Sequence, residues 1–249
     1  MAAADRQFVD ALARGLGLLE ALSRAQRPLS NGELSKATQL APSTVSRLTH
    51  TLTALGYTRL APGGRAYELT PKNLALGYPI LAGMSLIERA RPLLKHLAEM
   101  TGETAALAVR DGLHITFVEV VPGTNMVAVR LAMGGRLPIA VSAAGIALMA
   151  ALPERERRTL ATRVRSYITA RQGDMAVFDR CYEQATADGI AMIRDAWRPG
   201  IGGVSVAVRT ANEVAALTIP ISTGSVSETI MRGPLTEAIR TVAQRLEQV

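Results

Sequence analysis

The sequence predicts an α+β protein whose N-terminal part is a winged helix-turn-helix. Two short helical patterns flank a tight turn within residues 29–57, and a β-prone hairpin follows them. Farther along, the apolar spacing alternates between that of strands and that of helices. We therefore expect a small domain over residues 1–76, a linker helix over 77–101 and a larger domain over 102–249.

The first helix is predicted from apolar residues that recur at helical spacing. This stripe consists of Phe8, Val9, Leu12, Leu16 and Leu19. Because one side of a helix in a small domain normally faces its core, we expect these side chains to be buried.

The second helix is predicted from a capping box at its start. Ser30 and Glu33 stand three residues apart, so the side chain of each can hydrogen-bond the backbone amide of the other. Such a cap fixes the start of the helix locally. We expect the backbone amides at Ser30, Asn31 and Gly32 to be available there to a phosphate group.

The third helix begins at Pro42, which suits a first helical position because a proline lacks only an N–H that would have no intrahelical partner. Its outer face is polar and can donate to phosphates or base edges. The expected DNA contacts on this helix are Pro42, Ser43, Thr44, Ser46, Arg47 and His50. The alternative is a solvated helix of an ordinary bundle. Such helices usually mix Glu with Lys, whereas Arg47 is the only charged residue here.

A hairpin wing is predicted after the third helix. The β-prone segments 57–60 and 65–69 are separated by a turn sequence rich in proline and glycine. Arg65 stands at the tip, where its side chain could enter a minor groove or pair with a phosphate.

Composition fits a regulator that meets an anionic partner. The chain has 249 residues and a formal net charge of +7, which gives salt-dependent attraction to phosphate without specificity. Cys181 is the only cysteine, so no intrachain disulfide can form, and a reducing compartment such as the cytoplasm is expected. We expect no signal peptide and no membrane association, because no apolar run is long enough to span a bilayer.

The larger domain is predicted to combine an antiparallel sheet with helices. In the linker before it, Pro92 should introduce a kink and Gly102 should end the helix. Strands are expected at 105–109, 113–121, 126–132, 190–194, 204–208 and 215–221. Helices are expected at 143–152, 154–165 and 178–188, and from Ser227 onward.

No catalytic or metal site is expected. The three histidines show no metal-ligand spacing, and the chain has no motif of a known catalytic class. We therefore assign no catalytic residue, no metal and no cofactor. A binding pocket is better supported, since residues 142–145 lead from an apolar strand into a helix of small residues, whose free amides suit a carboxylate. A close contact between helix and sheet would require the same small residues.

The chain resembles the IclR family of bacterial transcription regulators from about Phe8 to Glu247. The resemblance rests on PSTVSRLTHTLTALGY at 42–57, TGETAALAV at 101–109, GGRLPIAVSAAG at 134–145 and GIAMIRDAWRPGIGGVSVAV at 189–208. It implies a GAF-like, effector-binding C-terminal domain. It also implies a homodimer or homotetramer on palindromic double-stranded DNA, with the DNA-binding domain and linker taking part in dimerisation. Repression and activation both remain open.

The resemblance also implies which residues form the effector pocket. Carried over by matching motifs, its wall comprises Met126, Val129, Leu137, Ala143, Ala144, Ile193, Gly203, Thr218 and Pro220. Relatives that sense very small polar acids often have Asp, Cys and Ser where this chain has Ile193, Gly203 and Pro220. We expect a larger and less polar carboxylic acid, such as an aromatic one. Trp197 either joins this wall or covers its mouth, and Arg130 either contributes or is solvated.

One function of another class remains open. The larger domain could be a ligand-binding or catalytic α+β domain whose N-terminal module serves protein assembly. Replacing Arg47 and His50 distinguishes the two, because only a DNA-binding regulator should lose operator affinity while it keeps its fold.

Overall fold

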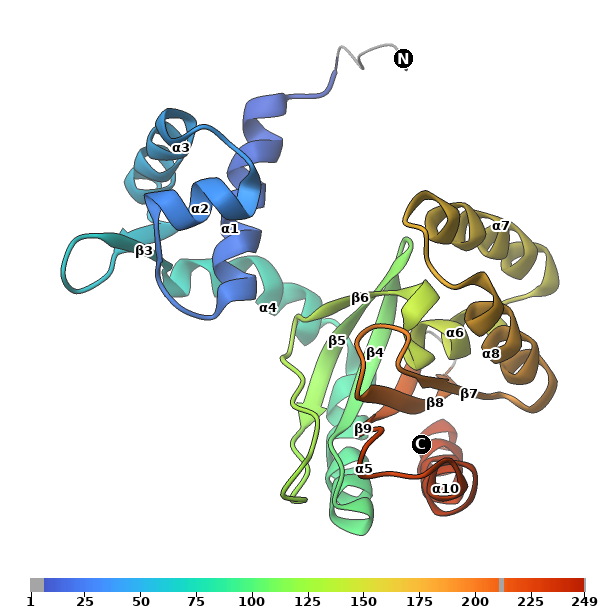
Figure 1. The fold of residues 1–249 in the computed structure, drawn as a ribbon. Helices are drawn as coiled ribbons and strands as arrows, with labels where there is room; N and C mark the ends of the chain where they lie inside the picture. The colour runs from blue at the N-terminus through green and yellow to red at the C-terminus, as the bar shows by residue number, and fades with distance from the viewer. Residues whose placement is uncertain (1–6, 211–212, 249) are drawn as a thin grey trace. The chain divides into compact units, whose positions relative to one another are not determined.

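The computed structural model describes residues 7–210 and 213–248, which form two compact units that divide between Gly83 and Met84 (Figure 1). The first unit is mainly helical with a small sheet, and the second combines a larger sheet with helices. The α+β fold expected from the sequence is therefore confirmed.

The first unit is a winged helix-turn-helix. Its elements are α1 (Asp10–Ala25), β1 (Leu29–Ser30), α2 (Asn31–Thr38), α3 (Pro42–Ala54), β2 (Thr58–Leu60), β3 (Ala66–Leu69), a 3-10 turn (Pro71–Asn73) and α4 (Leu74–Ala82). The strands pair antiparallel in the order β1-β3-β2, so β2 and β3 make the expected wing. The core between α1, α2 and α3 includes Leu18, Leu22, Leu34, Val45 and Leu52.

The predicted burial of α1 is wrong. Phe8, Val9, Leu12 and Leu16 are between 51% and 62% exposed, whereas the buried residues of the helix are Gly15, Leu18, Ala21 and Leu22. The cause is that α1 has apolar residues on two of its faces, and spacing alone does not tell which face meets α2 and α3. The expected core stripe is instead an exposed apolar surface, apart from Leu19, which packs partly against the core.

The single linker helix expected over 77–101 is instead two helices. The first, α4, ends at Gly83, Met84 is extended with φ −98° and ψ 92°, and α5 (Ser85–Thr101) then begins. Pro92 lies inside α5, so the interruption falls at Gly83 and Met84 and not at the proline. Glycine is a poor helix former, which favours a break at this point. Gly102 ends α5 in the left-handed conformation, as expected.

The second unit is a three-layer α+β domain. Its strands are β4 (Ala105–Asp111), β5 (His114–Val121), β6 (Arg136–Pro138), β7 (Ile190–Arg194), β8 (Ile201–Arg209) and β9 (Val214–Ser222). Its helices after α5 are a 3-10 turn (Ile139–Val141), α6 (Ala143–Ala150), α7 (Glu154–Ala170), α8 (Met175–Asp188), α9 (Glu228–Ile230), a π-helix (Met231–Leu235) and α10 (Thr236–Glu247). The strands pair antiparallel in the order β6-β5-β4-β9-β8-β7.

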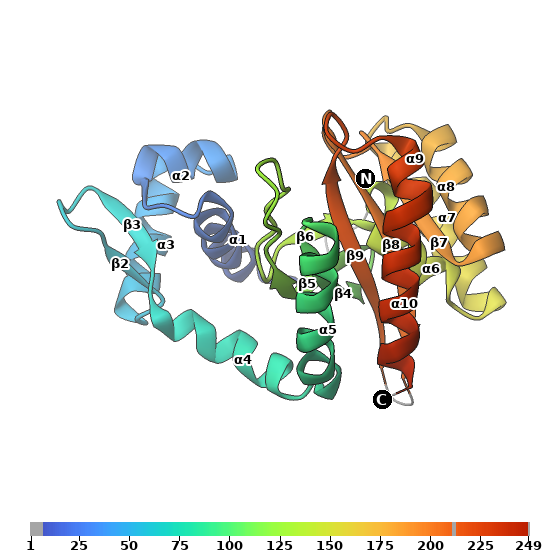
Figure 2. The same cartoon turned by 90° about the horizontal axis from the view of Figure 1, so that it is seen from below.

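Helices cover both faces of this sheet. The pair α5 and α10 pack together on one face, as Figure 2 shows, while α6 lies on the other face with α7 and α8 beside it. The buried core on the α6 side includes Ile115, Ile139, Ile146, Met149 and Phe178. Because small residues line α6, this helix approaches the sheet closely.

The strand expected at 126–132 is wrong, since these residues form no regular element. The reason lies at the edge of the sheet. Residues 136–138 pair with β5, and just before them the Gly134 amide donates to the Phe117 carbonyl at 2.8 Å. This part of the edge of β5 is thus already taken, and the β-prone segment has no partner there.

Candidate functional site

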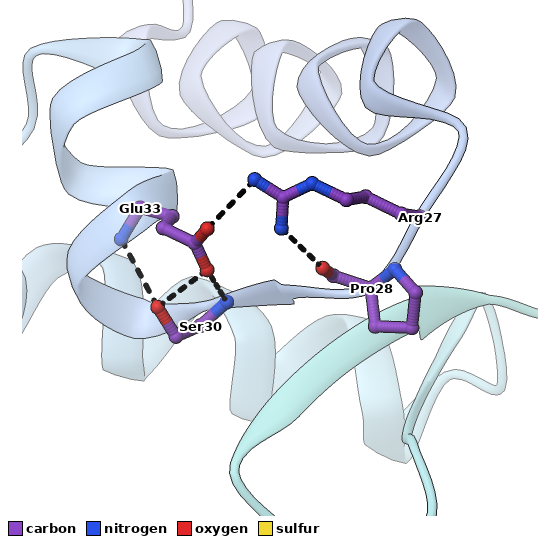
Figure 3. Close-up of polar contacts among 4 residues, drawn as sticks. All are labelled: Arg27, Pro28, Ser30 and Glu33. Carbon is purple, nitrogen blue, oxygen red and sulfur yellow. Dashed lines mark hydrogen bonds and ion pairs between the residues drawn. The ribbon is translucent and has the colours of Figure 1, made fainter.

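The start of α2 is closed by the predicted capping box. Ser30 Oγ accepts a hydrogen bond from the Glu33 amide at 3.3 Å, and Glu33 Oε2 accepts one from the Ser30 amide at 2.9 Å (Figure 3). Arg27 donates to Glu33 Oε1 at 2.8 Å. The hydrogen bond from the Ser30 amide, followed by those from Arg27 and the Ser30 hydroxyl, lowers the pKa of Glu33 to about 2.

This cap corrects one expectation about phosphate binding. The Ser30 amide already donates to the Glu33 carboxylate, so it is not free for a phosphate. Asn31 instead reaches toward the next helix, where its Nδ2 donates to the Pro42 carbonyl at 3.4 Å. Of the three expected phosphate donors, the Asn31 and Gly32 amides remain, at the first two residues of α2.

The outer face of α3 is polar and open. Pro42, Ser43, Ser46, Arg47 and His50 are exposed, and Thr44 is half-buried. The inward side of the helix buries Val45, Thr49 and Leu52.

Three of the expected DNA-binding side chains are free to donate. Arg65 is exposed at the turn of the wing. Within the described residues, the side chains of Arg47, His50 and Arg65 have no hydrogen-bond or ion-pair partner. This surface of α3 and the wing can therefore donate to an anionic partner without first breaking a contact.

A small cavity lies at the start of α6 and is walled by strands of the sheet. Its volume is about 50 Å³. Of the expected wall, it brings together Val129, Leu137, Ala143, Ile193, Gly203, Thr218 and Pro220. Two expected residues lie elsewhere: Met126 is fully exposed, because its segment leaves the sheet, and Ala144 is buried without lining the cavity. Ser142, in the segment expected to form a pocket, also lines the cavity. The sequence reasoning missed Phe117, Leu131, Val141, Ile201 and Gly202.

The cavity combines apolar walls with few polar groups. Ser142 Oγ accepts from the Gly145 amide at 3.2 Å, whereas Ala143 and Ala144 are the first helical residues, whose amides have no intrahelical partner. Across the cavity, Thr218 Oγ1 accepts from Ser205 Oγ at 2.6 Å. No charged side chain in the described part of the chain lines this space. The arrangement suits one polar or anionic group held by amides beside an apolar body.

Trp197 both lines the cavity and is 39% exposed, so the tryptophan stands at its mouth. Its loop is held by Asp195, whose φ is +57° and whose Oδ1 accepts from the Gly200 amide at 2.7 Å and the Thr223 hydroxyl at 2.8 Å. Arg198 lies 4.4 Å from the centre of the Trp197 ring. These contacts hold the Trp197 loop in a defined position over the mouth of the cavity, although the loop is exposed. The sequence indicated Trp197 but gave no signal for Asp195.

Glu213 connects the strand that walls the cavity to the start of α5. Its Oε2 accepts from the Leu86 amide at 3.0 Å and from the Ser85 hydroxyl at 3.3 Å. It stands next to β9, the strand that contributes Thr218 and Pro220 to the cavity. Sequence reasoning missed this cap because 127 residues separate the partners.

Residues 7–210 and 213–248 contain no group of three or more His, Cys, Asp or Glu that could hold a metal ion. The histidines belong to three different elements, with His50 on α3, His96 on α5 and His114 on β5. No helix in the same residues is long and apolar enough to cross a membrane.

Comparison with known proteins decides the family. Residues 11–62 match the model of the IclR helix-turn-helix domain, and residues 79–248 match that of the bacterial transcriptional regulator IclR C-terminal domain. The chain belongs to the IclR family. It is an IclR-type transcription regulator that binds DNA through its helix-turn-helix domain.

Individual relatives agree with this assignment. The Pca regulon regulatory protein of Pseudomonas putida is 28% identical over 228 residues, which cover 90% of this chain and 78% of the relative. A crystal structure of an IclR family transcriptional regulator from Brucella abortus is 30% identical and covers 99% of this chain and 94% of its own, with a TM-score of 0.72. An IclR homologue from Microbacterium hydrocarbonoxydans, complexed with 4-hydroxybenzoate, shares the fold at 22% identity and a TM-score of 0.69, with 96% and 98% covered.

Proposed function

We propose that this IclR-type regulator binds a palindromic operator in double-stranded DNA as a homodimer or homotetramer, under the control of a small carboxylic acid. The acid, for which aromatic acids are the first class to test, binds in the cavity at the start of α6. This cavity supports the proposal, since it joins Ser142 and Ala143, at the start of α6, to apolar walls. Anions are stabilised at helix N-termini by the amides and the helix dipole.

Operator reading is assigned to α3. Ser43, Ser46, Arg47 and His50 lie exposed on one face, and no acidic side chain occurs on this helix. In the major groove such donors contact base edges, and we assign phosphate contacts to the Asn31 amide and the exposed Arg65 side chain.

The test begins with selection of a preferred duplex from a random DNA library by the native protein. Arg47→Ala and His50→Ala should each weaken binding to that duplex by about tenfold or more. Arg163→Ala, which removes an exposed charge from α7, is the control and should change affinity little. Thermal unfolding followed by circular dichroism checks that each variant is folded. Unchanged DNA affinity in the double variant would refute the role of α3.

The dimer is assigned to the exposed apolar face of α1. Leu12, Leu16 and Leu19 line a groove of about 840 Å³ that continues over Leu48 and Leu55 of the α3 region. Monomeric proteins rarely leave a continuous apolar surface of this kind open. A second copy covers it by two-fold symmetry and matches the symmetry of a palindrome.

Sedimentation velocity tests this interface. Leu16→Glu places a charge in the groove and should shift the protein toward monomer. Val127→Glu is the matched control, since Val127 is 55% exposed but lies on the other unit. A Leu16→Glu protein of unchanged mass would exclude α1 as the interface.

The effector site requires movement on binding. Typical small-molecule sites have volumes of roughly 300–1,000 Å³, whereas this cavity has about 50 Å³. An aromatic acid therefore fits only if the Trp197 loop is displaced. The complex of 4-hydroxybenzoate with the relative from Microbacterium hydrocarbonoxydans supports an acid of this size in the shared fold.

A thermal-shift screen of aromatic and aliphatic acids tests the effector. Ala143→Leu should abolish the shift given by an active acid, because its side chain enters the cavity, and should leave operator affinity without acid unchanged. Ala170→Leu, at the exposed end of α7, is the control. An acid that stabilises native protein and Ala143→Leu equally binds elsewhere and would refute this site.

Control of DNA binding then follows from two states of the sensor unit. An acid shifts the balance only if it binds one state better, and couplings of about 1–3 kcal/mol are typical. The Glu213 contact gives a route within this unit, since it links β9 beside the cavity to the first turn of α5.

A further inference from the structure

A second pocket lies on the second unit, between α8, β7 and α9. Its volume is about 290 Å³, and its lining includes Arg180 and Cys181 of α8, Arg194 of β7, and Glu228 and Arg232 around α9. None of these residues lines the cavity at the start of α6. The operator surface and the effector cavity leave this pocket without a role.

The pocket has an excess of positive charge. Three arginines line it with a single carboxylate, that of Glu228, which pairs with Arg232 at 2.8 Å. Arg180 has no ion-pair or hydrogen-bond partner within the described residues. Arg194 donates to the carbonyls of Val226 at 3.0 Å and Thr223 at 2.9 Å, which are neutral acceptors. Two positive charges therefore have no acidic partner.

Arg194 is held in place by its own contacts. Besides the two carbonyls, its guanidinium lies 3.2 Å from Met231 Sδ, and Met231 is buried at the first residue of the π-helix. A π-helix is a rare distortion that often occurs at functional sites. The fixed position means that little rotamer freedom of this arginine is lost when an anion arrives.

The thiol of Cys181 lines the same pocket as the guanidinium groups of Arg180 and Arg232. Burial raises the pKa of the Cys181 thiol, while the positive charges of Arg180 and Arg232 act in the opposite direction. Both guanidinium groups are thus close enough to influence a thiol that lines the pocket. At neutral pH the thiol stays protonated and adds no negative charge that would repel an anion.

We propose that this pocket binds a compact dianion, either a dicarboxylate or a phosphate ester, at a site separate from the effector cavity. The planar fork of an arginine matches the two oxygens of a carboxylate or phosphate group. Apolar side chains of Met192 and Val177 in the lining can contact the carbon part of such a ligand. The volume of about 290 Å³ suits a small metabolite.

Alkylation of Cys181 provides a reporter in the full-length protein, because it is the only cysteine of the chain. Iodoacetamide is uncharged, so an anion slows its reaction by covering the thiol and not by competing for charge. We expect millimolar inorganic phosphate or succinate to slow alkylation in a saturable way. Protection by phosphate alone identifies the phosphate-ester class, and protection by succinate alone identifies the dicarboxylate class. Sodium chloride and acetate at matched ionic strength should give little protection.

Two variants place the ligand in the pocket. Arg180→Gln and Arg232→Gln should each raise the half-protecting concentration by about tenfold, since each removes a charge-assisted hydrogen bond. Arg158→Gln is the matched control, because Arg158 forms the same kind of ion pair, four residues from Glu154, outside the pocket. For each variant the alkylation rate with anion is divided by the rate without anion. A change in the basal reactivity of the thiol then does not affect the comparison. Equal protection by chloride, no protection by either dianion, or unchanged protection in both pocket variants would overturn the proposal.

Discussion

The starts of α2 and α6 are built on the same serine cap but end in opposite arrangements. Ser30 Oγ accepts from the Glu33 amide at 3.3 Å, and Ser142 Oγ accepts from the Gly145 amide at 3.2 Å. In α2 the third helical residue is a glutamate, whose carboxylate returns to the Ser30 amide. In α6 the same position is a glycine, and a cavity lies in front of the first turn.

The difference suggests a rule: the start of a helix is open to an external anion only where the chain supplies no negative charge of its own. Negative charge is stabilised at a helix N-terminus by the helix dipole and unpaired amides. Glu33 supplies that charge to α2. At α6, packing excludes any such side chain, because a Cβ at Gly145 would lie 2.6 Å from the Ile139 Cα. The position is left open for the proposed carboxylic acid.

The largest effect is expected from Gly145→Ala, which tests whether packing keeps the start of α6 open. The new methyl group overlaps the backbone of Ile139, so we expect a loss of about 3 kcal/mol in the free energy of unfolding. Urea unfolding monitored by circular dichroism measures it. Gly32→Ala is the control, since a Cβ there meets nothing within 4 Å. A stable Gly145→Ala protein would show that α6 can shift and that the contact with Ile139 does not dictate the glycine.

A smaller loss is expected from Ser142→Ala. Ser142 is 5% exposed, so the Gly145 amide loses its acceptor in a buried place, which should cost about 2 kcal/mol. Urea unfolding again measures the change, and Ser142→Thr, which keeps the acceptor, should recover most of it. Equal stability of the Ala and Thr variants would mean that the cap contributes nothing.

Ser30→Ala should lower the free energy of unfolding by about 1 kcal/mol, which is less than the loss expected for Ser142→Ala. The Ser30 cap is half-buried, and water can reach the amide that the hydroxyl leaves. Hydrogen exchange of the first-turn amides of α2 in the full chain is the measurement. If Ser30→Ala and Ser142→Ala lost equal stability, burial would not explain a difference between the two caps.

The smallest effect concerns pH and the exposed Glu33 carboxyl. Its pKa falls from 4.5 to about 2 on folding, so its contribution to stability is fully present above pH 4.5 and is lost as the pH falls toward about 2. Glu33→Gln should flatten this part of the stability profile and leave neutral pH behaviour almost unchanged. Acid titration of unfolding compares the variant with Glu99→Gln, an exposed glutamate of α5. Identical acid limbs in the native protein and Glu33→Gln would contradict the lowered pKa.

Local patterns were predicted well because their causes are local. The capping box, the start of α3 at Pro42 and the wing turn depend on residues within a few positions of one another. The strand expected at 190–194 has those bounds in the structure. Most residues of the expected effector wall also line one cavity in the structure. They were predicted from motifs shared with the family and not one by one.

Several errors share one cause, which is that they concern partners far apart in the chain. The sequence could not show that residues 134–138 occupy the edge of β5, which leaves 126–132 irregular and Met126 exposed. Nor could it show the Glu213 cap on α5 or the arginine pocket around Cys181. Each depends on which elements meet, and no short spacing encodes that.

Local sequence was enough to set the starts of α2 and α3, the polar face of α3, the wing and the apolar character of the proposed effector wall, because propensity, capping and periodicity act over a few residues. Tertiary structure decided which face of α1 is buried and which side chains share a cavity. These are outcomes of packing between distant segments, and α1 shows it most directly. Its two apolar faces look alike in sequence, and only contact with α2 and α3 made one of them the core.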